Sequence, residues 1–270
     1  MAAIMNPDVA DRLARSLTAE TAELIPYIPY LLQDLWELGS DPEVIVTLVG
    51  RHIEHPSQAR FLDLACGKGA VAVRLARAFG AHVTAIDLTA DFLSFAAHKA
   101  EEYGVEALCD FRLEDINRAV ERERDYDCAV YGAVGNVLGN PPETLGKLER
   151  TVSAGGFVVI DEAYAREDAD DVVRYRNYDY LSHNRWLEIF DRAGFDLIES
   201  VPAAEECGAG DAVDAELGLI AARAGELSVR HPGKKALFDA YVESQRSEYH
   251  DLQHAVTGVT WLLRKRRAQN

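Results

Sequence analysis

The sequence predicts an α/β protein built on a doubly wound, mostly parallel sheet. Short apolar runs alternate with stretches of helical periodicity between about residues 60 and 200. Strand–helix units repeated in this way build a parallel sheet with helices on both faces. A glycine-rich turn joins the first of these strands to its helix, and an acidic residue ends the second strand, as is typical of doubly wound sheets.

Composition limits the class of protein further. The chain has 270 residues, of which 48% are hydrophobic, and this suits one large domain or a domain with an appended subdomain. A disordered chain is excluded, because enough apolar residues are present to bury a core. With 28 Lys and Arg against 45 Asp and Glu, the net charge of −17 argues against general binding of nucleic acid.

Membrane, export and metal signals are weak. The apolar run at 24–33 contains two prolines and is too short to span a bilayer, and the opening residues have no apolar core typical of a signal peptide. The four cysteines (Cys66, Cys109, Cys128 and Cys207) form no C-x-x-C pair, so we expect reduced thiols and no metal site. These features predict a soluble, cytoplasmic protein.

Helical patterns occupy the first fifty residues. A polar, amphipathic stretch covers 8–17, and Leu31, Leu35 and Trp36 recur at helical spacing over 31–38. Asp41, followed by proline and glutamate, makes a sound helix start before 44–49.

Strands and helices then alternate. Strands are expected at 60–64, 82–86, 108–113, 126–131, 157–160, 195–201 and 258–263. Helices are expected at 70–79, 92–103, 145–152 and 186–193. Residues 203–251 are mostly helical by pattern, with breaks at 208–210 and 231–233, and we interpret 203–255 as a helical insertion before the last strand.

The most informative segment is residues 63–69 (Asp-Leu-Ala-Cys-Gly-Lys-Gly). Gly67 and Gly69 allow the backbone to turn sharply and to approach a ligand closely. Asp87 follows Gly67 by twenty residues and ends the second strand, where a carboxylate can accept both hydrogen bonds of a ribose diol. This order of elements indicates an adenosine-containing cofactor.

Two cofactors compete for this turn. Gly67, Gly69 and Ala72 satisfy the G-x-G-x-x-A pattern of nicotinamide enzymes. Asp63 argues against them, because a carboxylate at this point repels a pyrophosphate. An acid there suits a ligand with a cationic ammonium group, such as the methionine end of S-adenosylmethionine.

Three motifs resemble those of class I S-adenosylmethionine-dependent methyltransferases. Residues 63–69 resemble the first motif, 86–88 (Ile-Asp-Leu) the second and 113–116 (Leu-Glu-Asp-Ile) the third. The clearest departure is Ala65, where glycine is usual. The resemblance implies a seven-stranded sheet of order 3-2-1-4-5-7-6 with the last strand antiparallel. It also implies a Rossmann-like core at 58–202 and 256–267. From the pattern outside this core we expect a helical extension or lid at 1–57 and a substrate cap at 203–255.

The resemblance also implies roles for individual residues. Asp63 would orient the ammonium group, and Asp87 would hold the ribose hydroxyls. Asp115 would accept a hydrogen bond from the adenine amine, although the alternative for each acid is a solvated loop or a helix cap. The full set of expected cofactor contacts is Asp63, Ala65, Gly67, Lys68, Gly69, Asp87, Leu88, Phe92, Glu114, Asp115, Ile116 and Tyr131.

The acceptor side of the reaction is less clearly marked. Residues 131–136, after the fourth strand, lack the Asp/Asn-Pro-Pro-Tyr tetrapeptide of many members that methylate nucleic acids and proteins. Together with the acidic charge, this favours a small-molecule acceptor. Asn136 could orient the substrate or be an ordinary turn residue. Asp161 and Glu162 follow the fifth strand and could face the acceptor or cap a following helix.

Two residues of the helical insertion are further catalytic candidates. His250 could act as a general base, because imidazole titrates near neutral pH, and Tyr249 could offer a phenol contact. His250 and His254 also have the spacing of metal ligands on a helix, but no third ligand is evident. The alternative for this segment is a polar helix face.

The sequence therefore predicts an S-adenosylmethionine-dependent methyltransferase that acts on a small molecule and releases S-adenosylhomocysteine. The alternatives are an NAD(P)-dependent oxidoreductase, other S-adenosylmethionine chemistry such as cyclopropanation of a lipid, and a non-catalytic protein that binds S-adenosylmethionine. The identity of the acceptor atom (O, N, C or S) and the oligomeric state, a homodimer included, stay open.

Overall fold

The computed structural model describes residues 7–166, 173–175, 178–203 and 209–267. Cys207 lies outside these residues. The chain divides into two compact units: a sheet unit (36–162, 183–202 and 259–270) and a helical unit (1–35, 163–182 and 203–258). The sheet unit includes residues 36–57, which were expected to belong to the N-terminal extension.

Seven strands form one sheet in the order β3-β2-β1-β4-β5-β7-β6. The strands are β1 (Arg60–Leu64), β2 (His82–Asp87), β3 (Cys109–Leu113), β4 (Tyr126–Gly132), β5 (Val152–Ala165), β6 (Phe195–Pro202) and β7 (Val256–Lys265). Four pairs of neighbouring strands are parallel: β3 with β2, β2 with β1, β1 with β4 and β4 with β5. Strands β7 and β6 pair with each other in the antiparallel direction. The predicted fold class, strand order and antiparallel last strand are confirmed.

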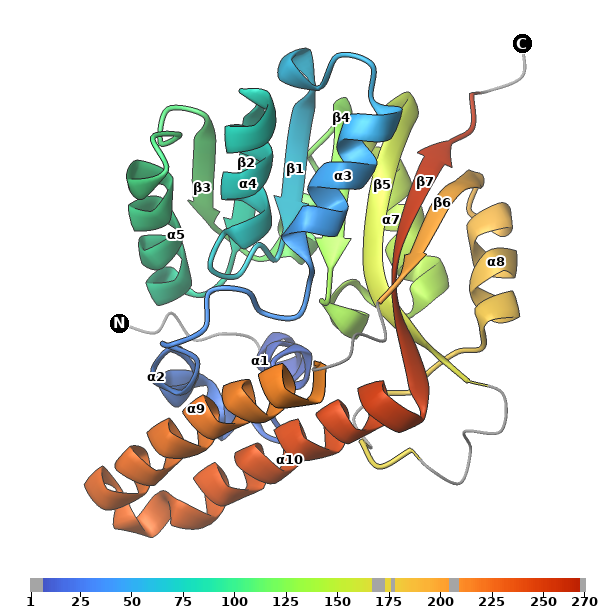
Figure 1. Cartoon of the computed structure of the whole chain (residues 1–270). Helices are drawn as coiled ribbons and strands as arrows, with labels where there is room; N and C mark the ends of the chain where they lie inside the picture. Colours follow the sequence, from blue (N-terminus) through green and yellow to red (C-terminus); the bar gives the residue numbers. More distant parts are fainter. Residues whose placement is uncertain (1–6, 167–172, 176–177, 204–208, 268–270) are drawn as a thin grey trace. The chain divides into compact units, whose positions relative to one another are not determined.

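Helices cover both faces of this sheet. On one face lie α3 (Pro42–His52), α4 (Ala70–Phe79) and α5 (Ala90–Glu102), and on the other lie α7 (Pro141–Thr151) and α8 (His183–Arg192) (Figure 1). Shorter turns complete the unit: η2 (Pro56–Gln58), α6 (Ile116–Ala119) and η3 (Gly135–Leu138). Asn140 begins α7 with a capping box to Glu143, which is why this helix starts four residues before the expected 145.

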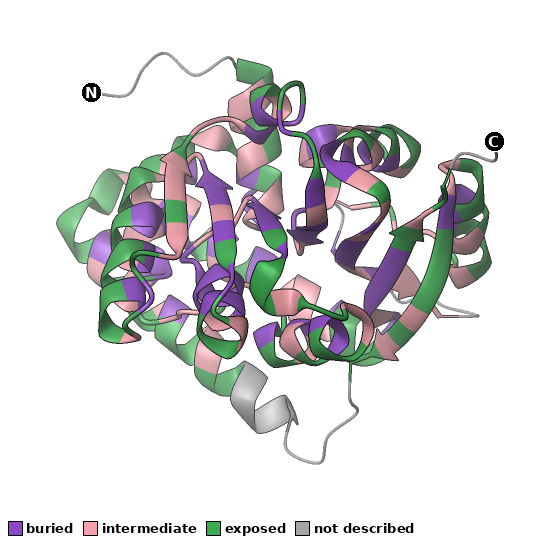
Figure 2. Cartoon of the chain, turned by 90° about the horizontal axis from the view of Figure 1, so that it is seen from above, coloured by how far each residue is buried: buried purple, intermediate pink, exposed green. Residues whose placement is uncertain are grey.

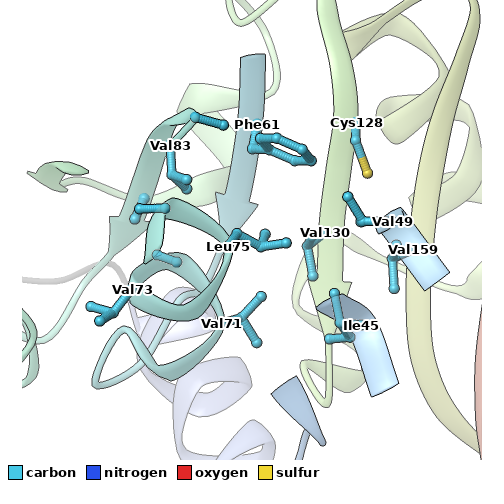
Figure 3. Packing of buried hydrophobic residues seen from close by; sticks show 14 of the residues in the cluster. Ile45, Val49, Phe61, Val71, Val73, Leu75, Val83, Cys128, Val130 and Val159 are labelled. Carbon is cyan, nitrogen blue, oxygen red and sulfur yellow. The ribbon is translucent and has the colours of Figure 1, made fainter. Parts of the chain in front are cut away.

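The main core lies between the sheet and the helices α3 and α4. Apolar side chains from β1, β2, β4 and β5 meet those from the two helices, as Figure 3 shows for Phe61, Val130, Val159, Ile45 and Leu75. All five are almost completely buried. Because parallel strands in this position are covered on both faces, β1 and β4 read as nearly continuous apolar runs.

Burial falls off at the edge of the sheet. In Figure 2, β7 is largely buried, whereas its neighbour β6 is mostly exposed. Trp261 of β7 packs against Trp186 and Phe190 of α8, with ring centroids 5.2 Å and 5.1 Å away. This aromatic cluster closes the core on the side where the sheet ends.

The helical unit is built mainly on a hairpin of α9 (Ala209–Arg230) and α10 (Lys235–His254), which lie side by side (Figure 1). The turn η4 (Pro232–Lys234) joins them at the break expected from 231–233. The unit also contains α1 (Pro7–Ser16), η1 (Ala22–Tyr27) and α2 (Ile28–Leu31). The two ends of the insertion meet, because the Ala203 N–H donates to the Gly258 carbonyl at 2.7 Å.

One local prediction is wrong, and another has the right element with bounds that are too short. The helical spacing over 31–38 does not produce a helix, since α2 ends at Leu31 and Trp36 instead donates its indole N–H to the Lys68 carbonyl at 3.1 Å. The strand expected at 157–160 is longer and continues to Ala165. No helix in the described part of the chain is long and apolar enough to cross a membrane.

Candidate functional site

The turn after β1 places three left-handed residues close together. Ala65, Gly67 and Gly69 have φ angles of +57°, +53° and +74°. A Cβ on Gly69 would lie 2.6 Å from the Ala96 Cβ of α5, so only glycine fits there. At Ala65 the same conformation costs alanine about 1 kcal/mol, which explains why glycine is usual at this point of the resembling motif.

Asp87 holds this turn against the end of β2. Its Oδ2 accepts a hydrogen bond from the Gly67 N–H at 2.9 Å, and its Oδ1 accepts one from the Thr89 N–H at 2.7 Å. Burial raises the pKa of Asp87, while these N–H donors lower it. A carboxylate offers about four acceptor positions, so Asp87 keeps capacity for a ribose diol.

Asp63, at the end of β1, is the most unusual group of the site. It is 4% exposed, and its Oδ2 has no hydrogen-bond partner among the described residues. Burial and then the neighbouring charge of Asp87 raise its pKa to about 7, against a smaller lowering by the Ala72 amide. A buried carboxylate without a cation is unstable in its charged form, and a cationic ligand would compensate it.

Residues 113–116, the third motif, make several hydrogen bonds and an ion pair with neighbouring parts of the chain. The Glu114 N–H donates to the Asp87 carbonyl at 3.0 Å, which fixes the motif beside β2. The Glu114 carboxylate pairs with Arg122, and this hydrogen-bonded pair lowers its pKa. Asp115 Oδ1 accepts from the Asn117 N–H at 2.8 Å and caps α6, the alternative considered for it from sequence. Ile116 begins α6 and is buried.

Four other predicted contacts lie in the same unit. Phe92 is buried at the start of α5, and Leu88 is half-buried. The Lys68 ammonium lies 4.5 Å from the centroid of the Phe95 ring. The Tyr131 hydroxyl donates to the Gly135 carbonyl at 2.7 Å and accepts from the Leu138 N–H at 3.4 Å, so its phenol stabilises the η3 turn.

The end of β4 pairs with an inner residue of β5 beside the segment before α3. Gly132 pairs with Asp161, and a Cβ on Gly132 would collide with the Ser40 hydroxyl. Asp161 Oδ2 accepts a hydrogen bond from the Thr260 hydroxyl at 3.2 Å. Burial raises the pKa of Asp161 to about 7, with smaller lowering by the Thr260 hydroxyl and the Asp41 amide.

The structure excludes one interpretation of the acids after the fifth strand. Asp161 and Glu162 lie inside β5, which continues to Ala165, so they cap no helix. Glu162 Oε1 accepts from the Gly135 N–H at 3.1 Å. Asn136 is exposed within η3, and its carbonyl accepts from the Gly139 N–H at 3.1 Å, as expected of a turn residue.

Tyr249 and His250 belong to α10 of the helical unit. The Tyr249 hydroxyl donates to Glu216 Oε2 at 3.0 Å, and His250 Nδ1 lies 3.4 Å from Asp251 Oδ1. The rings of His250 and His254 are 4.7 Å apart. The described residues contain no group of three or more His, Cys, Asp or Glu arranged to hold a metal ion.

Asp251 and Ser40 make specific contacts in the structure, although neither is among the site residues predicted from the sequence. Asp251 is fully buried and accepts hydrogen bonds from the Arg174 and Tyr175 amides at 2.8 Å and 2.7 Å. Its spacing from the buried Ser244 and Gln245 on the same helix could have indicated an inward-facing acid. Ser40 had no comparable signal, because its position depends on contact with a distant strand.

Comparison with known proteins agrees with this architecture. A family model described as a methyltransferase domain matches residues 55–201, more than half of the chain. Uncharacterized protein YjhP of Escherichia coli is 28% identical over 166 residues, covering 58% of this chain and 66% of that protein. Methyltransferase GfsG of Streptomyces halstedii is 27% identical over 158 residues, covering 54% and 56%. The matches thus span about two thirds or less of these relatives.

Solved structures extend the likeness to most of the chain. A SAM-dependent methyltransferase from Geobacter sulfurreducens, in complex with S-adenosyl-L-homocysteine, superposes with a TM-score of 0.74 at 24% identity, over 89% of this chain and 98% of that one. YjhP superposes with a TM-score of 0.69 at 21% identity, over 88% and 100%. This chain therefore belongs to the methyltransferase domain family, with the fold of class I S-adenosylmethionine-dependent methyltransferases.

Proposed function

We propose that this protein binds S-adenosylmethionine at the carboxyl ends of β1, β2 and β3 and transfers its methyl group to a small molecule by in-line displacement. The observation that carries the proposal is the buried, unpartnered Oδ2 of Asp63. A cationic ammonium group is the partner that this oxygen lacks. A pyrophosphate, which a nicotinamide cofactor would bring to the same turn, would add repulsion.

The residues around Asp63 fit the rest of this ligand. Asp87 has acceptor capacity for the ribose, and the left-handed turn at Ala65, Gly67 and Gly69 allows close approach of the backbone. Phe92 and Leu88 supply apolar surface for the adenine. Asp115 and the Ile116 amide would recognise the edge of the base, with Glu114 and Lys68 holding the surrounding loops.

The sulfonium of the bound donor makes its methyl carbon electrophilic. The protein's own residues then have to orient an acceptor and exclude water. A small-molecule acceptor is supported by the net charge of −17 and by the absence of an Asp/Asn-Pro-Pro-Tyr tetrapeptide after β4. Asn136, Tyr249 and His250 stay predictions for the acceptor side, as do the substrate-cap role of 203–255 and a homodimer.

Calorimetric titration of the purified protein tests the proposal. S-Adenosylmethionine and S-adenosylhomocysteine should bind saturably and NADH should not. Asp87→Ala should abolish binding, whereas Asp91→Ala, a change of an exposed acid in the first turn of α5, should preserve it. A thermal melt of each variant checks that it folds. Binding of NADH alone would overturn the proposal.

Transfer is tested with S-adenosylmethionine that carries a labelled methyl group. The label should enter the small-molecule fraction of a cell extract rather than its protein or nucleic-acid fractions. Binding of the donor without transfer to any fraction would favour a non-catalytic binding protein.

A further inference from the structure

We propose that Asp161 is the general base of the reaction and that the methyl acceptor is a hydroxyl group. The inference rests on the proposed function, because it assigns the proton acceptor for the same methyl transfer. It concerns residues of the sheet unit alone.

Asp161 lies on the opposite side of β4 from the proposed donor site. Asp63 of β1 pairs with Val130 of β4, and Asp161 of β5 pairs with Gly132 on the other side of the same strand. Adjacent strands are about 4.8 Å apart, so the rows that carry the two acids are separated by about 10 Å across the sheet. An acceptor placed over the end of β4 would therefore lie between the ammonium site and Asp161.

The surroundings of Asp161 shield it partly from water, since the residue is half-buried in β5. Asp161 follows Val159 by two residues on β5, so the two side chains lie on the same face of the strand. On this face Val159 packs in the core with residues of α3. The charge of Asp41, at the start of α3, also disfavours the ionised form. These effects raise the pKa of Asp161 to about 7, and a general base works best with a pKa near the operating pH.

Other titratable groups near these strand ends have structural tasks. The Tyr131 hydroxyl is held by the η3 turn, Glu162 accepts from Gly135, and Asp41 Oδ1 caps α3 through the Glu43 and Val44 amides. Asp161 accepts from Thr260 and is close to the Asp41 amide, which uses two of about four acceptor positions of a carboxylate. The remaining positions can accept a substrate proton.

The proton balance points to a hydroxyl acceptor. An alcohol or phenol oxygen forms the new bond to the methyl carbon, while the S–CH3 bond breaks and its electron pair stays on sulfur. The hydroxyl proton passes to the Asp161 carboxylate and then to water. A thiolate, a carboxylate or a neutral amine attacks without prior proton loss, so such acceptors need a base less.

The test begins with calorimetry, which separates this inference from the proposed function. S-Adenosylmethionine should bind wild type and Asp161→Asn with dissociation constants within about twofold, because the amide preserves the shape of the side chain. Failure of wild type to bind would refute the proposed function itself. Weakened binding by Asp161→Asn alone would assign Asp161 to the donor site and overturn the inference.

Labelled methyl transfer is then measured with phenol, 1-hexanol, hexanoic acid, hexylamine, hexanethiol and a small-molecule extract. We expect a hydroxyl compound to be methylated, with kcat/KM rising about tenfold per pH unit below pH 7 and level above it. Asp161→Asn should lower the rate by about 10²–10⁴-fold and abolish this pH dependence. Transfer to no hydroxyl compound, or an unchanged pH profile in Asp161→Asn, would overturn the inference.

Two further variants distinguish a base from a structural acid. Thr260→Val removes a hydrogen bond to the charged carboxylate, so the midpoint of the pH profile should move to higher pH. Glu162→Gln changes the adjacent acid, whose side chain points to the opposite face of the strand, and should leave the midpoint in place. A midpoint that follows Glu162 instead would assign the proton to that residue.

Discussion

Replacing Asp63 with asparagine should stabilise the ligand-free protein while weakening its binding of S-adenosylmethionine. In the native state burial raises the pKa of this carboxyl to about 7, whereas an unfolded aspartate titrates near 4. The native state therefore holds the proton more tightly, and the stability of the protein falls as the pH rises from 4 to 7. A difference of three pKa units corresponds to about 4 kcal/mol, which is the cost of ionising Asp63 in the folded protein. Asparagine carries no charge, so the variant avoids this cost.

The pH dependence of this gain is its signature. At pH 8 the full difference of about 4 kcal/mol applies, equivalent to an increase of roughly 10 °C in Tm. At pH 5 most of the penalty is absent, and the gain should fall to about 1.5 kcal/mol. Loss of the charged hydrogen bond to the ammonium group should weaken binding of S-adenosylmethionine by about 10- to 100-fold. Thermal melts at pH 5, 6, 7 and 8, and calorimetry at pH 8, measure both effects.

Two comparisons make the experiment decisive. Asp91→Asn, in the exposed first turn of α5, should show no gain that increases with pH. Asp161 has its own raised pKa, so part of the wild-type slope should persist in Asp63→Asn. A loss of stability at pH 8, or a gain equal at pH 5 and pH 8, would refute the argument that Asp63 Oδ2 is an uncompensated acceptor.

Three other variants test the structure more directly. Gly69→Ala should lower the free energy of unfolding by about 3 kcal/mol, since the new Cβ adds a clash to the strain of a positive φ. Gly80→Ala has similar strain but open space around the new Cβ, so it should lower the free energy by about 1 kcal/mol. Denaturant unfolding of both variants measures the difference. Asp251→Ala should cost about 3 kcal/mol, because it leaves two main-chain N–H groups without their acceptor, and hydrogen exchange of those amides should accelerate. Glu114→Gln should lower the stability of the folded protein by less than about 1 kcal/mol at pH 7, because it removes the ion pair with Arg122. This loss should disappear as the pH falls through the lowered pKa of Glu114, since the pair stabilises only the charged form.

The sheet could be predicted well because its signals are local. Several strands of the core contain a short apolar run, and the glycine turn and Asp87 mark the first two strand ends. The strand order followed from the resemblance rather than from periodicity, since pairing between distant strands leaves no local pattern. The failure over 31–38 has the same origin: Trp36 lies at helical spacing, but its indole N–H is satisfied by the carbonyl of Lys68 far along the chain.

The site was only partly predictable for a related reason. The residue types of Asp63 and Asp87 and their places after strands could be identified, but the missing partner of Asp63 Oδ2 is a property of the folded state. Asp161 was expected to cap a helix rather than to act on a substrate, because the length of β5 was underestimated. Asp115, for which both a cap and a ligand contact were considered, caps α6 in the structure.

The hydrogen bond between Ala203 and Gly258 has a consequence for protein engineering. It closes the base of the insertion next to the last pair of β6 and β7, Pro202 and Val259. A segment whose ends already meet can be exchanged without altering the register of the strands that flank it. The hairpin of α9 and α10 is therefore a natural graft position, at which chimeras of related enzymes could exchange 204–255 and keep the sheet intact.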